Sequence, residues 1–152
     1  MTTPIDHLKE KLEKKGDKEL AVLIGTGSYN PVHIGHIEIF KLAKEKLSQK
    51  FEILGGYISP SHRDYVETKG DYIEIEDRLK MIELAVEEAG CSDWLKADPW
   101  ESSQDGFLDF PYVVKRLGNY LKETFPEEKI RFFFFAFKFF FLILKSFIYL
   151  WF

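Results

Sequence analysis

A continuous run of five apolar residues, Leu20-Ala21-Val22-Leu23-Ile24, limits most strongly what this chain can fold into. A run without alternation is typical of a strand that is covered on both faces, as in a parallel sheet. Gly25 closes the run, and from about His33 to Ser48 the apolar residues follow the helical period instead. A strand, a loop and a helix in this order predict the first unit of an α/β domain.

The same alternation continues along the rest of the chain, with strands predicted at 51–59, 94–97 and 129–135, and helices at 76–89 and 112–123. A short amphipathic helix is expected near the N-terminus. The buried face of the 76–89 helix is predicted to consist of Leu79, Ile82, Leu84, Ala85 and Val86. This order predicts an α/β, Rossmann-like fold, in which a parallel sheet with right-handed crossovers is flanked by helices.

Composition excludes several classes of function. The chain has 152 residues and a net charge of -4, so it resembles an ordinary acidic domain and offers no basic surface for nucleic acid. A single cysteine, Cys91, excludes an intramolecular disulfide and a cysteine-based zinc cluster. Residues 1–15 are charged and lack the apolar centre of a secretory signal. We therefore expect a cytoplasmic protein, with a nuclear location equally open.

The segment after the first strand carries the candidate chemistry, and it reads Gly25-Thr26-Gly27-Ser28-Tyr29-Asn30-Pro31-Val32-His33-Ile34-Gly35-His36. It falls where an open α/β sheet binds its ligands, at the end of a strand and the start of a helix. The unpaired N–H groups of a helix N-terminus suit phosphate. Glycines at 25 and 27 let the backbone approach a nucleotide closely. His33 and His36 would share one helix face, so both imidazoles could donate to one triphosphate.

This segment does not match other common nucleotide-binding or zinc-binding motifs. It lacks the third glycine of the dinucleotide fingerprint and the Gly-Lys-Ser/Thr of a Walker A loop. The two histidines have neither the spacing of a zinc-binding His-Glu-x-x-His motif nor an evident third ligand, so no metal ligation by the protein is predicted. Taken alone, His33 could be a helix-start residue and His36 a satisfied core histidine.

The segment resembles the G-x-F-x-P-x-H-x-G-H signature of the nucleotidylyltransferase superfamily, with Tyr29 in place of phenylalanine. The tetrapeptide 33–36 also occurs in class I aminoacyl-tRNA synthetases, but this chain lacks their second, lysine-rich loop. Later segments are similar to eukaryotic-type nicotinamide/nicotinate mononucleotide adenylyltransferases, and the resemblance covers roughly residues 20–131. These segments are Ser59-Pro60 with Asp64, Tyr65 and Lys69, then Arg78 with Met81, Leu84 and Ala85, and finally Asp98-Pro99-Trp100-Glu101-Ser102.

The resemblance implies an enzyme that joins the AMP moiety of ATP to nicotinamide or nicotinate mononucleotide, releasing pyrophosphate, in NAD biosynthesis. It implies that His33 and His36 are catalytic and contact the ATP phosphates. It further implies Mg²⁺ bound through those phosphates, and small-molecule substrates as partners, with no nucleic acid and with a membrane contact expected only through residues 132–152. The nucleotide-binding residues it implies are Gly25, Gly27, Ser28, Tyr29, Lys69, Trp100 and Phe107. For Trp100 and Phe107, a place in the hydrophobic core is an equal alternative.

The chain departs from the family after about Arg131, so we expect a partial nucleotidylyltransferase-like domain at 1–131 and a hydrophobic tail at 132–152. Ten of the 15 phenylalanines lie in that tail, and the family's later phosphate-binding segments are missing. A frameshift or retained intron, a membrane tail interrupted by Lys138 and Lys145, and a buried divergent segment are the competing explanations. The alternative functions are therefore a non-catalytic nucleotide-binding remnant and a tail-anchored membrane protein.

Overall fold

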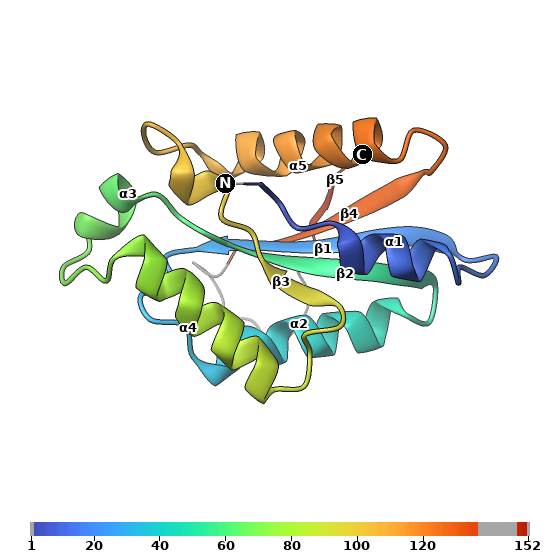
Figure 1. Cartoon of the computed structure of the whole chain (residues 1–152), viewed down its shortest axis with the longest axis horizontal. Helices are drawn as coiled ribbons and strands as arrows, with labels where there is room; N and C mark the ends of the chain where they lie inside the picture. Colours follow the sequence, from blue (N-terminus) through green and yellow to red (C-terminus); the bar gives the residue numbers. More distant parts are fainter. Residues whose placement is uncertain (1, 137–148, 152) are drawn as a thin grey trace.

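The computed structural model describes residues 2–136 and 149–151 (Figure 1). Its elements, in chain order, are α1 (Asp6–Leu12), β1 (Glu19–Gly27), α2 (Ile34–Leu47), β2 (Phe51–Pro60), α3 (Arg63–Glu67), α4 (Ile75–Glu88), β3 (Leu95–Ala97), a 3₁₀ turn η1 (Glu101–Ser103), α5 (Phe110–Thr124), β4 (Ile130–Ala136) and β5 (Tyr149–Trp151). The sheet forms the middle layer. Helices α2 and α4 cover one face, whereas α1 and α5 cover the other (Figure 1).

The strand order is β3-β2-β1-β4-β5, and the four strands from β3 to β4 are parallel. This confirms the predicted α/β, Rossmann-like fold with a parallel sheet. β1 lies between β2 and β4, which explains why its apolar run shows no alternation: both faces and both edges are covered. The short β5 pairs with β4 in the antiparallel direction. That antiparallel strand was not predicted.

Two hydrophobic clusters, one on each face of the sheet, form the core. Leu20, Val22 and Ile24 of β1 point to the cluster under α1 and α5, whereas Ala21 and Leu23 point to the cluster under α2 and α4. The side chains of a strand alternate between the two faces, so a single buried strand supplies both clusters. The central strand thereby fixes the positions of the helices that flank it.

Close packing explains the two glycines in the middle of β2. A Cβ placed at Gly55 would lie 2.6 Å from Cδ2 of Leu8 and 2.7 Å from Nε2 of His7. A Cβ at Gly56 would lie 3.0 Å from Cδ1 of Leu95. A larger residue at Gly55 would therefore push α1 away from the sheet.

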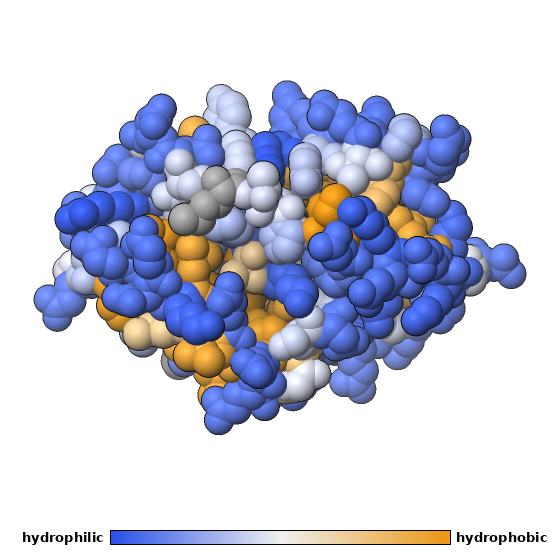
Figure 2. All heavy atoms as spheres, in the orientation of Figure 1, coloured by the Kyte–Doolittle hydropathy of each residue, from blue (hydrophilic) through white to orange (hydrophobic). Residues whose placement is uncertain are grey.

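The buried face of α4 differs from the prediction. Ile82 and Val86 are buried as expected, but Leu84 is 51% exposed, so its assignment to the core was wrong. Arg78, one turn before Ile82, is buried on the face that the prediction filled with leucines. On the side of the molecule that carries α4, Figure 2 shows hydrophobic atoms between hydrophilic ones. Met81 and Leu84 of this helix are exposed.

The phenylalanine-rich segment begins inside the sheet. Phe133, Phe134 and Phe135 are buried in β4, in agreement with the strand predicted at 129–135. The predictions that concern residues 137–148 and 152 lie outside the described residues. Within 2–136 and 149–151, no helix has both the length and the apolar character needed to cross a membrane.

Candidate active site

The glycine-containing loop lies where β1 and β2 both end. The backbone N–H of Ser61, just after β2, donates a hydrogen bond to the carbonyl oxygen of Gly27 at 2.8 Å, so the two strand ends are tied together. Tyr29 has a left-handed backbone with φ 43°. Its ring is only 2% exposed and lies 4.9 Å from the ring of His36. The loop thus turns one aromatic ring inward, while Gly27 and Ser28 line an open cleft.

The two histidines lie together at the start of α2. His33 is the N-cap residue, with an extended backbone, and its N–H donates to Nδ1 of His36 at 3.0 Å. The two ring centroids are 3.7 Å apart. The rings therefore meet through a capping interaction and not, as expected, because both residues lie on one face of the helix. Both rings line the cleft, next to the N–H groups of the first helical turn.

The surroundings of His36 fix its protonation. Burial, and then the electrostatic effect of the neighbouring His33 ring, lowers the pKa of His36 to about 4. The imidazole is therefore neutral at pH 7. Because Nδ1 accepts the hydrogen bond from the His33 backbone, the proton of the neutral ring is on Nε2. His36 is thus a hydrogen-bond donor that keeps its form across the physiological pH range.

A cation and a pair of stacked rings come from α3, from the residues that follow it and from the loop before α5. Nζ of Lys69 donates to the hydroxyl of Ser28 at 2.9 Å and lies 4.0 Å from the centroid of the Tyr65 ring. Tyr65 and Phe107 are stacked, with centroids 4.9 Å apart and an angle of 15° between the rings. Phe107 is 43% exposed, so one aromatic surface is open to a planar ligand.

Most of the predicted nucleotide-binding residues meet in one cleft of about 860 Å³. The predicted residues that line it are Gly27, Ser28, Tyr29, His33, His36, Lys69 and Phe107. Gly25 lies further back, inside β1, and does not line the cleft. Trp100 does not line it either. Its ring packs against the cluster under α5, and the guanidinium of Arg116 lies 4.5 Å from its centroid.

Among the charged residues near the cleft that were not predicted as site residues, Arg78 and Glu101 are buried. Arg78 is 0% exposed and hydrogen-bonds to the backbone of the loops that form the cleft. A charged residue among the buried positions of an amphipathic helix was the signal that could have revealed it, since such charges are rarely buried without partners. The second residue, Glu101, lines the cleft although only 1% of it is exposed.

The carboxyl group of Glu101 reaches the end of β2. Its Oε2 accepts a hydrogen bond from the hydroxyl of Ser59 at 2.7 Å. Burial raises the pKa of Glu101 to about 7, and the negative charge of Asp98 adds to this, whereas hydrogen bonds from Ser59 and Ser61 and the positive charge of Arg78 act in the opposite direction. No sequence pattern pointed to this contact, which joins residues 42 positions apart.

The described residues contain no group of three or more His, Cys, Asp or Glu side chains that could hold a metal ion. Besides the carboxyl groups of Asp71, Glu101 and Asp109, the cleft offers donors: two imidazoles, one ammonium group, one hydroxyl and the N–H groups at the start of α2. A set of donors around a helix N-terminus suits an anion with several oxygens.

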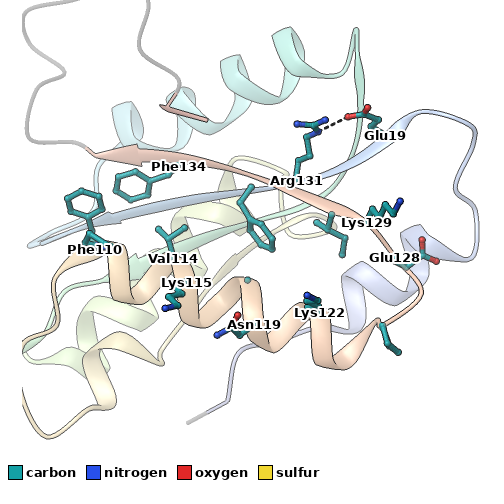
Figure 3. Close-up of a pocket in the computed structure, with 15 residues that line it drawn as sticks. Glu19, Phe110, Val114, Lys115, Asn119, Lys122, Glu128, Lys129, Arg131 and Phe134 are labelled. Atoms are coloured by element: carbon teal, nitrogen blue, oxygen red, sulfur yellow. Dashed lines mark hydrogen bonds and ion pairs between the residues drawn. The ribbon is translucent and has the colours of Figure 1, made fainter. Parts of the chain in front are cut away.

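A second hollow, a groove of about 1030 Å³, lies between α5 and β4 (Figure 3). Phe110 and Phe134 stack at one end, with centroids 4.8 Å apart and an angle of 7° between the rings. Arg131 and Glu19 pair at 2.7 Å on the β4 side (Figure 3). The two histidines and the loop after β1 do not line this groove, so the signature residues belong to the cleft alone.

Sheet order, loop and cleft together define the class of this protein: a nucleotidylyltransferase-type α/β domain. The comparison with protein families agrees with that class. The chain belongs to the cytidylyltransferase-like family, and the model of this family matches residues 24–140.

The chain is also similar to individual proteins with known names. The chain is 36% identical over 118 residues to a nicotinamide/nicotinic acid mononucleotide adenylyltransferase of Arabidopsis thaliana, and 37% identical over 109 residues to one of Oryza sativa subsp. japonica. It is 41% identical over 109 residues to a nicotinamide/nicotinic acid mononucleotide adenylyltransferase 2 of Xenopus tropicalis. These matches cover 76%, 71% and 70% of this chain, but only 48%, 42% and 34% of the three relatives. The chain therefore spans half or less of the length of each.

Proposed function

We propose that this chain is an adenylyltransferase that joins the AMP moiety of ATP to nicotinamide or nicotinate mononucleotide, forming the dinucleotide in NAD biosynthesis. An oxygen of the mononucleotide 5′-phosphate attacks the α-phosphorus of ATP. The bond from that phosphorus to the oxygen bridging the α- and β-phosphates breaks, and pyrophosphate leaves. No protein nucleophile is needed, so catalysis consists of positioning two anions and stabilising the charge that develops.

The observation that carries this proposal is the pair of adjacent imidazoles at the N-terminus of α2, inside the cleft. The Nε2–H of the neutral His36 would donate to a phosphate oxygen, and His33 would donate to the same triphosphate. The Gly27–Ser28 backbone and Lys69 would hold the phosphates from the other side. ATP would enter as its Mg²⁺ complex, with the metal carried by the phosphates.

The mononucleotide would bind at the Tyr65–Phe107 end of the cleft. The exposed ring of Phe107 offers a face on which the pyridine ring of the mononucleotide can stack. Gly25 and Trp100 would act only indirectly, because neither lines the cleft. Trp100 directly precedes η1, the turn that contains Glu101. Its packing against the cluster under α5 would hold that turn in place.

The test is an assay of the purified full chain with ATP, Mg²⁺ and each mononucleotide in turn. We expect equal amounts of pyrophosphate and dinucleotide, and none of either when the mononucleotide is omitted. Binding of ATP without any dinucleotide would overturn the transferase proposal. It would favour the second candidate, a nucleotide-binding domain without catalysis.

A cytoplasmic location, with the nucleus as the open alternative, remains a prediction from the charged N-terminal residues. Small molecules are the partners we propose, since the net charge of -4 does not suit nucleic acid. Fractionation of cells that produce the tagged full chain would test the location, and recovery in the membrane pellet after carbonate extraction would contradict it.

A further inference from the structure

Arg78 is a fully buried cation in the first turn of α4, on the helix face that packs against the sheet. It shares its helix face with Ile82 and Val86, and its relative exposure is 0%. Removing a guanidinium from water is expensive unless the group is well bonded. The contacts of Arg78 therefore indicate what the residue does in the folded protein.

Those contacts join three separate segments. Nη1 of Arg78 donates to the carbonyl oxygen of Ser28 at 2.8 Å and to that of Ser61 at 3.0 Å. Its Nε donates to the carbonyl oxygen of Ile73 at 3.0 Å. Ser28 belongs to the loop after β1, Ser61 follows β2, and Ile73 precedes α4. One planar group thus ties together the loop after β1, the residue that follows β2 and the segment before α4, and the first two of these line the cleft.

Glu101 reaches the same strand end from the η1 turn. Its carboxylate accepts from the hydroxyl of Ser59, two residues before the Ser61 carbonyl that Arg78 holds. The opposite charges of Arg78 and Glu101 also interact, since the positive charge of Arg78 counteracts the effect of burial on the pKa of Glu101. The end of β2 is thus held by a buried cation and a buried carboxyl group.

We propose that Arg78 and Glu101 are positioning residues, which hold the Ser28 and Ser61 loops at the separation that lets a triphosphate contact both the histidine pair and Lys69. This inference rests on the proposed function, because it assumes that ATP occupies the cleft. Neither residue takes part in the bond changes. If they stabilised only the core, their replacement would lower stability without changing the geometry of the site.

The test uses three variants of the purified full chain. Arg78→Lys keeps the positive charge but loses the planar fork that reaches several carbonyls. Glu101→Gln keeps the shape of the side chain and an acceptor for Ser59 but removes the charge. Lys80→Gln is the matched control, because it removes a cation from the exposed side of the same helix.

Two readouts are measured for each variant: ATP affinity by calorimetry, and the ring resonances of His33 and His36 by NMR without ligand. We expect Arg78→Lys to weaken ATP binding about 10-fold, the scale for losing a hydrogen bond to a charged group. We expect it to shift both histidine resonances, while those of His7, which packs against Tyr57 on the α1 side of the sheet, stay in place. Glu101→Gln should show the same changes at smaller size, and Lys80→Gln none.

The outcomes separate this inference from the proposed function. If the wild-type chain does not bind ATP, the proposed function fails, whereas the histidine resonances still test positioning. If Arg78→Lys folds, binds ATP as tightly as the wild type and leaves both resonances unchanged, the positioning role is overturned. If Arg78→Lys does not fold, Glu101→Gln and Ser59→Ala decide the question, and unchanged resonances in both would overturn it.

Discussion

The cleft at the ends of β1 and β2 and the groove between α5 and β4 are similar in size, at about 860 and 1030 Å³, but their walls differ. Aromatic and aliphatic side chains of α5 and β4 form much of the groove, and the charges of Arg131 and Glu19 at its side are paired (Figure 3). The cleft brings together loop backbone, two imidazoles, an ammonium group and a buried carboxyl group.

This difference shows that volume does not identify a functional site, whereas convergent polar groups do. In the groove, contact between apolar surfaces keeps a helix and a strand together, so its residues act mainly on stability. In the cleft, hydrogen bonds set the positions of loops and rings, so its residues act mainly on binding and turnover. Substitutions in the groove and in the cleft therefore test whether stability and binding can be changed separately.

Phe134→Ala should produce the largest loss of stability. The side chain is 2% exposed and stacks on Phe110, so its removal leaves a cavity that costs about 3–5 kcal/mol. Urea unfolding measures this loss, and calorimetry on the remaining folded protein should show unchanged ATP affinity. If Phe134→Ala kept its stability but bound ATP much more weakly, the groove and the cleft would not have separate roles.

His36→Ala should have the opposite profile. It removes a donor from the site of reaction, and we expect turnover to fall roughly 100-fold, the scale for losing one such group. The urea midpoint should change little, because the ring is only partly buried. Leu42→Ala, on the exposed side of the same helix, is the control. Undiminished turnover in His36→Ala would remove this residue from the mechanism.

Acid should destabilise the cleft through His36. Its pKa is about 4 in the folded chain and about 6.5 when unfolded, so the unfolded chain binds the proton more readily between these values. The contribution of neutral His36 to the free energy of unfolding is therefore fully present above pH 6.5 and is lost as the pH falls toward 4. Because the ring is half-exposed, the loss should be on the order of 1 kcal/mol. Urea midpoints of the wild type and His36→Gln, compared from pH 7 to pH 4.5, should diverge, and parallel curves would contradict the assignment.

Phe107→Leu should weaken binding of the mononucleotide more than binding of ATP. Loss of an aromatic stacking partner costs about 0.5–1.5 kcal/mol, which is a roughly 2- to 10-fold rise in KM for the mononucleotide. Tyr112→Leu is the matched control, since Tyr112 is an exposed aromatic residue that does not line the cleft. If Phe107→Leu and Tyr112→Leu had the same KM for the mononucleotide, the pyridine ring would not stack on Phe107.

Arg131→Ala should have the smallest effect. The ion pair with Glu19 is largely exposed, with 44% and 61% of the two side chains accessible, and such pairs contribute about 0.2–1 kcal/mol. Urea unfolding at low and high salt measures this contribution, which should shrink at high salt. A loss above 2 kcal/mol would mean that the charges beside the groove do more than pair at the surface.

Much of the fold could be predicted because local pattern and burial agree. The apolar run at 20–24 has one plausible place in an α/β sheet, between two neighbouring strands. Helix α3 was not predicted, because its five residues lie in a polar segment too short to show a helical period. Leu84 was misplaced because apolar residues at helical spacing were all assigned to the core, while the buried Arg78 occupied part of that face.

From residue pattern alone, the candidate site could be predicted only where its residues are adjacent in sequence, whereas Lys69 and Phe107 were predicted from the family resemblance. The loop with His33 and His36 forms one continuous segment, so the spacing of its residues could be recognised from the sequence alone. Arg78 and Glu101 reach the loops across 50 and 42 positions of sequence, through contacts that only the folded sheet creates. Residues that bind can often be read from a motif, whereas residues that hold the binding loops in place depend on the tertiary fold.

The left-handed backbone of Tyr29 restricts which substitutions this protein could accumulate. A β-branched residue there would suffer steric strain on the order of 1–3 kcal/mol, whereas glycine or asparagine would accept the backbone but leave a void beside His36. Phenylalanine retains the aromatic bulk at the cost of the hydroxyl group. Substitution at this position is thus limited from two sides, by the backbone conformation and by the space beside His36.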